Sequence, residues 1–145
     1  MGLDPNSLPD RVLNKMAKTD RPPGILTAIE ASEKELKRFE REEQRLFINW
    51  LLLAEERGEL WFDSSATHKR VTCRVGKPDF LIAPMGRPAF WIEFKLPSGR
   101  FSPEQCKVIN TLMDLGQAVF IVKSADEAIR IVRRQLSKPT STTAS

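Results

Sequence analysis

Two acidic residues, Asp79 and Glu93, are spaced so that a tight turn would bring their side chains together. The β-rich runs 79–83 and 89–96 flank a five-residue turn centred on Gly86, which predicts a β-hairpin with Asp79 opposite Glu93. Directly opposed residues on one face have Cβ atoms ~5 Å apart, and two carboxylates there repel unless a cation or proton lies between them. The pattern indicates a cation site; the alternative is an exposed hairpin face with weak surface ion pairs.

A lysine accompanies the two carboxylates. Strand alternation places Trp91, Glu93 and Lys95 on one face of the hairpin. Mg²⁺ is held by one or two carboxylates, keeps several waters, and takes its other oxygens from a substrate phosphate. Such an ion polarises a phosphoryl oxygen and activates a water, while a neighbouring ammonium orients that water and offsets developing charge. Asp79 and Glu93 suit the metal-binding role, and Lys95 suits the role of the ammonium.

A third carboxylate is expected on a long amphipathic helix over residues 31–57, which Gly58 ends. Apolar residues recur in it at intervals of three and four: Leu36, Phe39, Leu46, Phe47, Trp50, Leu53 and Ala54. At ~100° per residue, Glu43 lies in the middle of this stripe and Glu40 just outside one edge. A carboxylate facing a core needs a partner, so Glu43 is predicted to point at the hairpin carboxylates. The alternative is a boundary glutamate on a highly charged helix.

The remaining elements follow from strand patterns and helix caps. The sequence predicts that a strand begins at residues 60–62 and that a loop follows at 63–69. It also predicts a strand at 71–75 and a buried strand at 118–122. Ser102 and Gln105 form a capping box for a helix that ends at Leu115, with Gly116 as its left-handed cap. A second box, Ser124 with Glu127, begins a helix that reaches about residue 136.

Length and composition favour one globular domain. The chain has 145 residues, 41% hydrophobic and 29% charged. We expect residues 1–30 to form an arm or linker, 31–136 the domain, and 137–145 a disordered tail. No apolar stretch approaches the ~20 residues of a membrane span, and no signal sequence opens the chain, so a cytoplasmic protein without a membrane partner is expected. Cys73 and Cys106 are expected to be buried thiols.

Charge is distributed unevenly along the chain. Residues 64–145 carry 13 basic and 6 acidic side chains, whereas residues 1–63 carry 10 basic and 13 acidic ones. The positive potential therefore belongs to the C-terminal part, where either a polyanionic partner or a merely solvated basic surface would explain it.

Three motifs together resemble a known family. They are Gly-Lys-Pro-Asp-Phe at 76–80, Trp-Ile-Glu-Phe-Lys at 91–95, and Gly-Arg-Phe-Ser-Pro-Glu-Gln at 99–105. In this order and spacing they are similar to the VRR-NUC nucleases, a branch of the PD-(D/E)xK phosphodiesterases. That family includes small phage and bacterial proteins and the nuclease domain of a eukaryotic DNA-repair enzyme. The resemblance covers about residues 40–136 and implies an α/β, restriction-endonuclease-like αβββαβ core, with a mixed central sheet flanked by helices.

The resemblance also implies roles for individual residues. Asp79, Glu93 and the backbone carbonyl of Phe94 would bind Mg²⁺, for which Mn²⁺ would substitute, and Lys95 would be catalytic. The family's helix glutamate is either Glu43, which also could bind metal, or Glu40. Gln105 resembles a glutamine facing the family's site, although its capping box explains it without chemistry. Phosphate contacts are expected from residues flanking the site, any of which could instead be only a surface group: Lys69, Arg70, Arg74, Lys77, Arg100 and Ser102.

These observations lead to one main expectation and two alternatives. The main expectation is a Mg²⁺-dependent endonuclease that cuts DNA by metal-activated water, leaving 5′-phosphate and 3′-hydroxyl ends. By resemblance it would be structure-selective, acting as a homodimer on Holliday junctions or other branched DNA. The alternatives are a module that binds branched DNA without cutting it, and a sequence-specific restriction-type endonuclease. An RNA substrate stays open.

Overall fold

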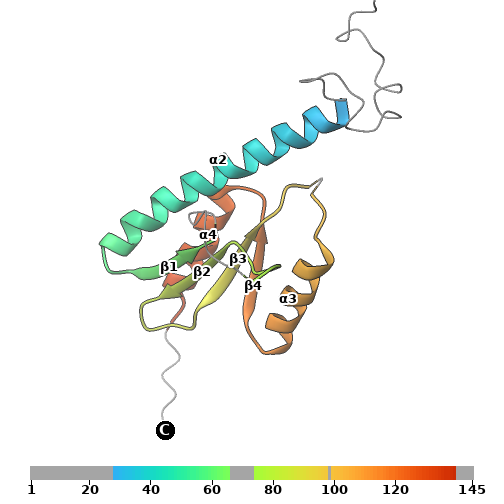
Figure 1. Cartoon of the computed structure of the whole chain (residues 1–145). Coiled ribbons are helices and arrows are strands. Elements are labelled where there is room, and N and C mark those ends of the chain that lie inside the picture. Colours follow the sequence, from blue (N-terminus) through green and yellow to red (C-terminus); the bar gives the residue numbers. More distant parts are fainter. Residues whose placement is uncertain (1–27, 66–73, 98, 140–145) are drawn as a thin grey trace, which may run out of the picture. The chain divides into compact units, whose positions relative to one another are not determined.

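The computed structural model describes residues 28–65, 74–97 and 99–139. The chain divides into two compact units, residues 1–39 and 40–145. In the first unit only residues 28–39 are described, and they form the beginning of helix α2. The elements in chain order are α2 (Ala28–Glu56), β1 (Leu60–Ser64), β2 (Phe80–Pro84), β3 (Phe90–Phe94), α3 (Pro103–Asp114), β4 (Ala118–Val122) and α4 (Ala125–Ser137), as Figure 1 shows.

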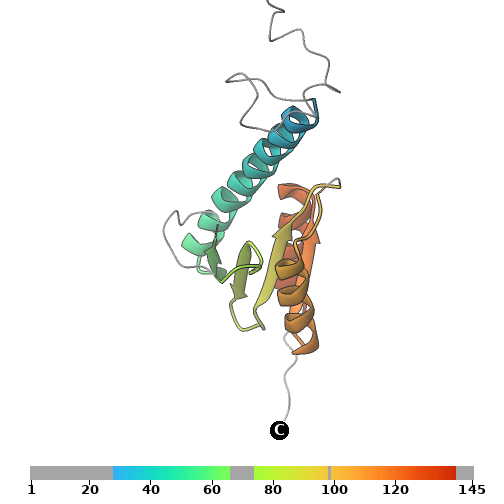
Figure 2. The ribbon, with the colours of Figure 1, turned by 45° about the vertical axis from the view of Figure 1, so that its right-hand side comes forward.

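The second unit contains a four-stranded mixed sheet in the order β1-β2-β3-β4. The first three strands are antiparallel neighbours, and β4 pairs in parallel with β3. Residues 40–56 of α2 and helix α4 cover one face of the sheet, and α3 covers the other (Figures 1 and 2). The chain is therefore a mixed α/β protein with helices on both faces of its sheet, as expected.

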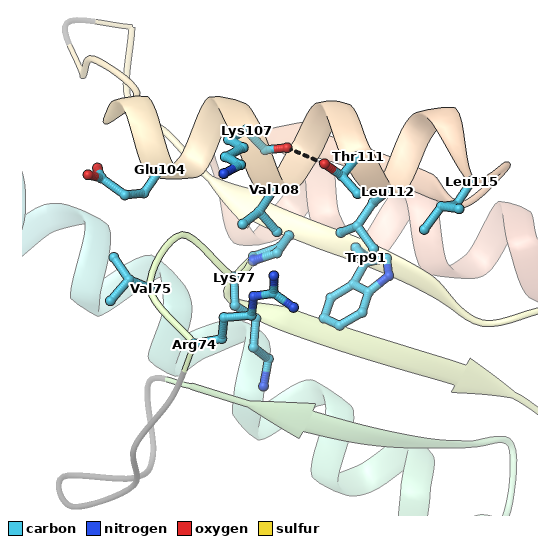
Figure 3. A pocket seen from close by; sticks show the side chains of 11 residues that line it. Arg74, Val75, Lys77, Trp91, Glu104, Lys107, Val108, Thr111, Leu112 and Leu115 are labelled. Carbon is cyan, nitrogen blue, oxygen red and sulfur yellow. Dashed lines mark hydrogen bonds between the residues drawn. The ribbon is translucent and has the colours of Figure 1, made fainter.

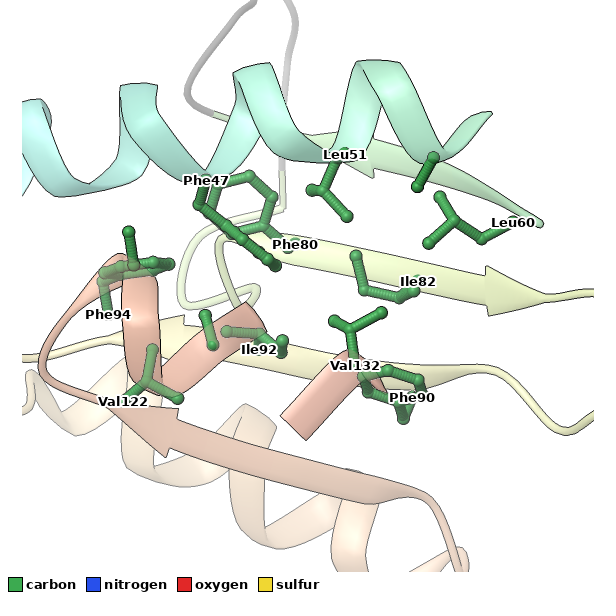
Figure 4. Packing of buried hydrophobic residues seen from close by; sticks show 13 residues of the cluster. Phe47, Leu51, Leu60, Phe80, Ile82, Phe90, Ile92, Phe94, Val122 and Val132 are labelled. Carbon is green, nitrogen blue, oxygen red and sulfur yellow. The ribbon is translucent and has the colours of Figure 1, made fainter. Parts of the chain in front are cut away.

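The core lies between the sheet and the face that α2 and α4 cover. Alternate strand residues point into it, including Phe80 and Ile82 of β2, because side chains along a strand alternate between its two faces. Figure 4 shows Phe47 and Leu51 of α2 above these residues. The rings of Phe47 and Phe80 meet edge to face with centroids 5.0 Å apart. Because Phe80 follows Asp79 directly, this packing fixes α2 over the start of the hairpin.

The core-facing stripe of α2 differs from the expected one. Phe47, Leu51 and Ala54 are fully buried, as their 3.6-residue spacing requires. Leu46 is 55% exposed because it is rotated by ~100° from Phe47 around the helix. Leu36, Phe39 and Leu53 belong to the expected stripe but are exposed, as is the adjacent Leu52. The predicted stripe was too wide, and its centre was misplaced.

The hairpin has the predicted register. Phe80 pairs with Ile92 and Ile82 with Phe90, around a turn that contains Gly86 at φ 67°. Asp79 stands one residue before β2 rather than within it. Its backbone carbonyl still accepts a hydrogen bond from the Ser65 amide, so this position is held by the neighbouring β1 segment.

Two strand predictions need correction. Strand β1 continues through Asp63 and Ser64, which were expected in a loop, because Ser64 pairs with Phe80. The predicted strand 71–75 is not seen at Arg74 and Val75, which lead into a turn; residues 71–73 lie outside the described part. Strand β4 has the predicted bounds but is not fully buried, because it is an edge strand paired with β3 alone.

The helix caps agree with the sequence in most details. The capping box of Ser102 and Gln105 is present, and Gly116 follows α3 with φ 80°. At α4, the Ser124 hydroxyl accepts from the Glu127 amide, but the Glu127 carboxylate accepts from the amide of Lys123 rather than Ser124. The second box is therefore displaced by one residue.

Several predictions concern the ends of the chain and the thiols. Helix α2 begins at Ala28, inside the expected arm, and residues 1–27 and 140–145 lie outside the described part. The Cys106 thiol is exposed rather than buried, and Cys73 is not described.

Among the described residues, no helix combines the length and apolarity needed to cross a membrane.

Candidate metal-binding and catalytic site

Asp79 is held at the start of the hairpin by backbone and side-chain contacts. Its Oδ2 atom accepts hydrogen bonds from the Phe94 amide, at 2.9 Å, and from Nε2 of Gln44, at 3.2 Å. Its own amide donates to Oε2 of Glu93 at 3.0 Å. The hairpin therefore brings Asp79 and Glu93 into contact, as its register predicts.

Glu93 is buried between the sheet and α3. Only 2% of the residue is exposed. Its Oε1 atom accepts a hydrogen bond from Nε2 of Gln105, 2.9 Å away, which ties β3 to the first turn of α3. An exposed hairpin face is thus the wrong interpretation for Glu93, because α3 covers this end of the strand.

Both carboxyl groups have pKa values above their usual range. Burial is the main cause for each, because it disfavours the charged form. The neighbouring charge of Asp79 adds to the effect on Glu93, whose pKa rises to about 8. The hydrogen bond from the Phe94 amide opposes the increase in the pKa of Asp79. The buried Glu93 in contact with the half-buried Asp79 favours a shared proton or a bound cation.

Gln105 connects the acidic pair to a lysine. While its Nε2 donates to Glu93, its Oε1 accepts from the Ser102 amide at 2.9 Å and lies 3.5 Å from Nζ of Lys95. The Lys95 ammonium also lies 5.1 Å from the ring centroid of Phe101. Gln105 therefore completes the capping box and also contacts both Glu93 and Lys95.

The helix glutamate does not occupy the expected position. Oε2 of Glu43 accepts a hydrogen bond from the amide of Ala125, 2.6 Å away, at the beginning of α4. The next residue, Gln44, is the one that contacts Asp79. Glu40 is half-buried one turn earlier. The structure thus gives Glu43 a role at a helix terminus, where its charge complements the helix dipole.

The donor set suits a hard cation that needs few protein ligands. No group of three or more His, Cys, Asp or Glu side chains that could hold a metal occurs in the described part of the chain. Asp79 and Glu93 supply the one or two carboxylates that Mg²⁺ requires, since waters and substrate oxygens complete its coordination. The Phe94 amide bonded to Asp79 shows that the backbone of this residue, whose carbonyl was a predicted ligand, borders the site.

The residues predicted to contact phosphates differ in whether their polar groups already have a partner within the protein. Arg74 and Arg100 are exposed. Nζ of Lys77 forms an ion pair with Asp63 at 3.2 Å. The Ser102 hydroxyl accepts from the Gln105 amide as the helix cap. Lys69 and Arg70 lie outside the described residues.

Sequence reasoning missed Gln44 and Asp63. Gln44 is 9% exposed and precedes Phe47, Leu51 and Ala54 by three, seven and ten residues. It therefore belongs to the buried stripe of α2. A prediction that had limited the core-facing stripe to this spacing would have included Gln44. Asp63 was missed because the strand was expected to end before it.

The chain was also compared with known proteins. No family model matches it, and neither a curated protein nor a solved structure shows significant similarity. The resemblance to VRR-NUC nucleases therefore depends on the three motifs alone.

Proposed function

We propose that this protein is a Mg²⁺-dependent nuclease that hydrolyses phosphodiester bonds in DNA. The observation that carries the proposal is the contact of the half-buried Asp79 with the buried Glu93, whose carboxylate is linked to Lys95 through Gln105. Burial raises the pKa of both carboxyl groups, and the charge of Asp79 raises that of Glu93 further, so both groups gain from a cation that replaces the proton. Such arrangements are more frequent at functional sites than elsewhere.

Each residue has a distinct task in this proposal. Asp79 and Glu93 bind the ion, which supplies Lewis-acid activation of the phosphodiester and of water when bound. Lys95 orients the attacking water and offsets negative charge that develops on the phosphoryl oxygens. Gln105 is a positioning residue, since it holds Glu93 with one end of its amide and faces Lys95 with the other. Gln44 positions Asp79 in the same way.

The fold supports this proposal at the level of topology. The order from α2 to β4 is the αβββαβ order of restriction-endonuclease-like folds, and the acidic residues lie on its second and third strands or directly before them. We therefore also propose that this protein has the restriction-endonuclease-like fold and belongs to the VRR-NUC branch. Selectivity for branched DNA such as Holliday junctions and action as a homodimer belong to the same proposal.

The decisive experiment is a cleavage assay with matched labelled DNA. Four-way junction, flap, single-stranded and linear duplex substrates are incubated with Mg²⁺, Mn²⁺ or EDTA. We expect metal-dependent cutting of branched DNA that falls at least about 100-fold in Lys95→Ala, because one electrostatic contact to the transition state contributes that much. The matched control is Lys138→Ala, an exposed lysine whose backbone carbonyl contacts Arg87 near the hairpin turn, away from the acidic pair.

The outcomes separate the proposal from its alternatives. Binding of branched DNA without metal-dependent turnover, by folded protein, would favour the binding module. Cutting at one short sequence in linear duplex would favour a restriction-type enzyme. Equal activity of Lys95→Ala and Lys138→Ala would contradict the assigned mechanism.

A further inference from the structure

A second feature lies beside the acidic pair, on the face of the sheet that α3 covers. It is a pocket of about 490 Å³ between α3, strand β3 and the segment that leads into β2 (Figure 3). This volume is within the range of pockets that hold small organic groups. The acidic pair does not line it, so its chemistry differs from that of the proposed cleavage site.

The pocket combines an aromatic surface with cations. Trp91 of β3 is half-buried at its base, and Val108 and Leu112 of α3 lie across from the indole (Figure 3). Arg74 and Lys107 are exposed cations that also line it. Because the described lining carries more cations than carboxylates, with Glu104 its one acidic residue, the apolar slot fits a flat aromatic group that carries an anion.

The pocket adjoins the acidic pair along three elements. Trp91 lies two residues before Glu93 on the same face of β3, a separation of ~7 Å along the strand. Pro78 and Glu104 also line the pocket, and they precede Asp79 and Gln105, respectively, in the sequence. A ligand in the pocket therefore lies next to the proposed metal site, without occupying it.

The wall formed by the segment before β2 is held closely against α3. Gly76 has φ 86°, and a Cβ atom there would lie 2.4 Å from the carbonyl oxygen of Glu104. Only glycine permits this approach of backbone to backbone. The two sides of the pocket are thus fixed relative to each other and to Gln105, so the pocket is preformed.

We infer that this pocket binds an unpaired nucleobase of the DNA strand to be cleaved, stacked on Trp91, with its phosphates near Arg74 and Lys107. This inference rests on the proposed nuclease function and names the part of the substrate that gives selectivity. Bases in a continuous duplex are stacked on each other, whereas bases at junctions, flaps and single strands can turn outward. Aromatic stacking tolerates any base, so selectivity for DNA structure rather than sequence would follow.

The test measures binding apart from cleavage. The full chain is titrated in EDTA with a fluorescent single-stranded oligonucleotide, and separately with the continuous duplex of the same sequence. Trp91→Ala should weaken single-strand binding by about 10-fold or more, as expected for loss of one stacked base. It should change duplex binding less than about twofold. Trp91→Phe should restore most of the affinity, because phenylalanine keeps a stacking surface.

Two further variants make the test specific. Trp61→Ala is the matched control, since Trp61 is an exposed tryptophan on edge strand β1 and does not line the pocket. Thr111→Trp places a large side chain into the pocket from an exposed position of α3 and should weaken single-strand binding as Trp91→Ala does. Its surface position keeps the test valid if Trp91→Ala does not fold.

The results distinguish failure of this inference from failure of the proposed function. Lys95-dependent cleavage together with unchanged single-strand binding in Trp91→Ala and Thr111→Trp would overturn the inference and leave the nuclease proposal intact. Selective loss of single-strand binding in these variants, without cleavage by the wild type, would support the pocket and contradict the nuclease. No single-strand binding by the wild type would also overturn the inference.

Discussion

Glu93 holds a carboxyl group where a negative charge is costly. It is almost completely buried, its neighbour Asp79 is also acidic, and Gln105 supplies only a neutral hydrogen bond. A protein evolved only for stability would gain from an apolar residue at such a position. The energetic cost of placing two acids here favours a function that uses them.

The raised pKa of Glu93 predicts how stability depends on pH in EDTA. The folded protein keeps this carboxyl protonated up to about pH 8, whereas the unfolded chain ionises it near its ordinary value of 4.5. Between these values the folded state binds more protons, so the free energy of unfolding should fall as pH rises. The raised pKa of Asp79 acts in the same direction. Urea unfolding between pH 5 and about 8.5 measures the slope.

Two comparisons assign this slope to the acidic pair. Glu93→Gln should flatten it, while Glu56→Gln, at the exposed end of α2, should leave it unchanged. Saturating Mg²⁺ should stabilise the wild type more at pH 8 than at pH 6, because protons compete with the cation for the carboxylates. A wild-type stability that is constant across the range would contradict the prediction.

At the scale of elements, Glu43 shows how one helix supports another. Its carboxylate reaches from α2 to the first amide of α4, where amides lack partners within the helix. We expect Glu43→Ala to lower the free energy of unfolding by about 1–2 kcal/mol, through loss of this bond and of the favourable dipole interaction. Mg²⁺ affinity should not change. Chemical denaturation and calorimetric metal titration of the same samples measure both quantities.

The conservative variant separates charge from hydrogen bonding. Glu43→Gln keeps an acceptor oxygen and should lose less stability than Glu43→Ala. Loss of Mg²⁺ binding in either variant, with stability unchanged, would instead support the metal-binding role that the resemblance to VRR-NUC nucleases implies for Glu43.

Local sequence patterns predicted most of the elements well. Ser102, Gln105 and Gly116 set the limits of α3, because caps depend on residues close in sequence. Gly86 and the prolines around it set the hairpin register, and through it the contact of Asp79 with Glu93. The end of β1 was not predictable in this way, since Asp63 and Ser64 become strand only by pairing with β2.

At the scale of the whole molecule, the proposed homodimer stays a prediction. A twofold-symmetric pair would present two equivalent sites to two strands of a branched DNA. Sedimentation equilibrium at the concentrations used for cleavage should give twice the mass of one chain. A monomer that cuts both strands of a junction at the same concentration would contradict the prediction.

The sequence by itself determined the local parts of the site: the hairpin, its opposed carboxylates, Lys95 and the cap containing Gln105. These depend on residues within about 25 positions of each other, and their geometry follows from strand alternation and capping rules. Only the tertiary structure decided that Gln44 rather than Glu43 contacts Asp79, and that Trp91 forms a pocket with α3. The rotation of α2 and the placement of α3 result from packing against the sheet. This packing depends on contacts between residues far apart in the sequence, so no local sequence pattern predicts it.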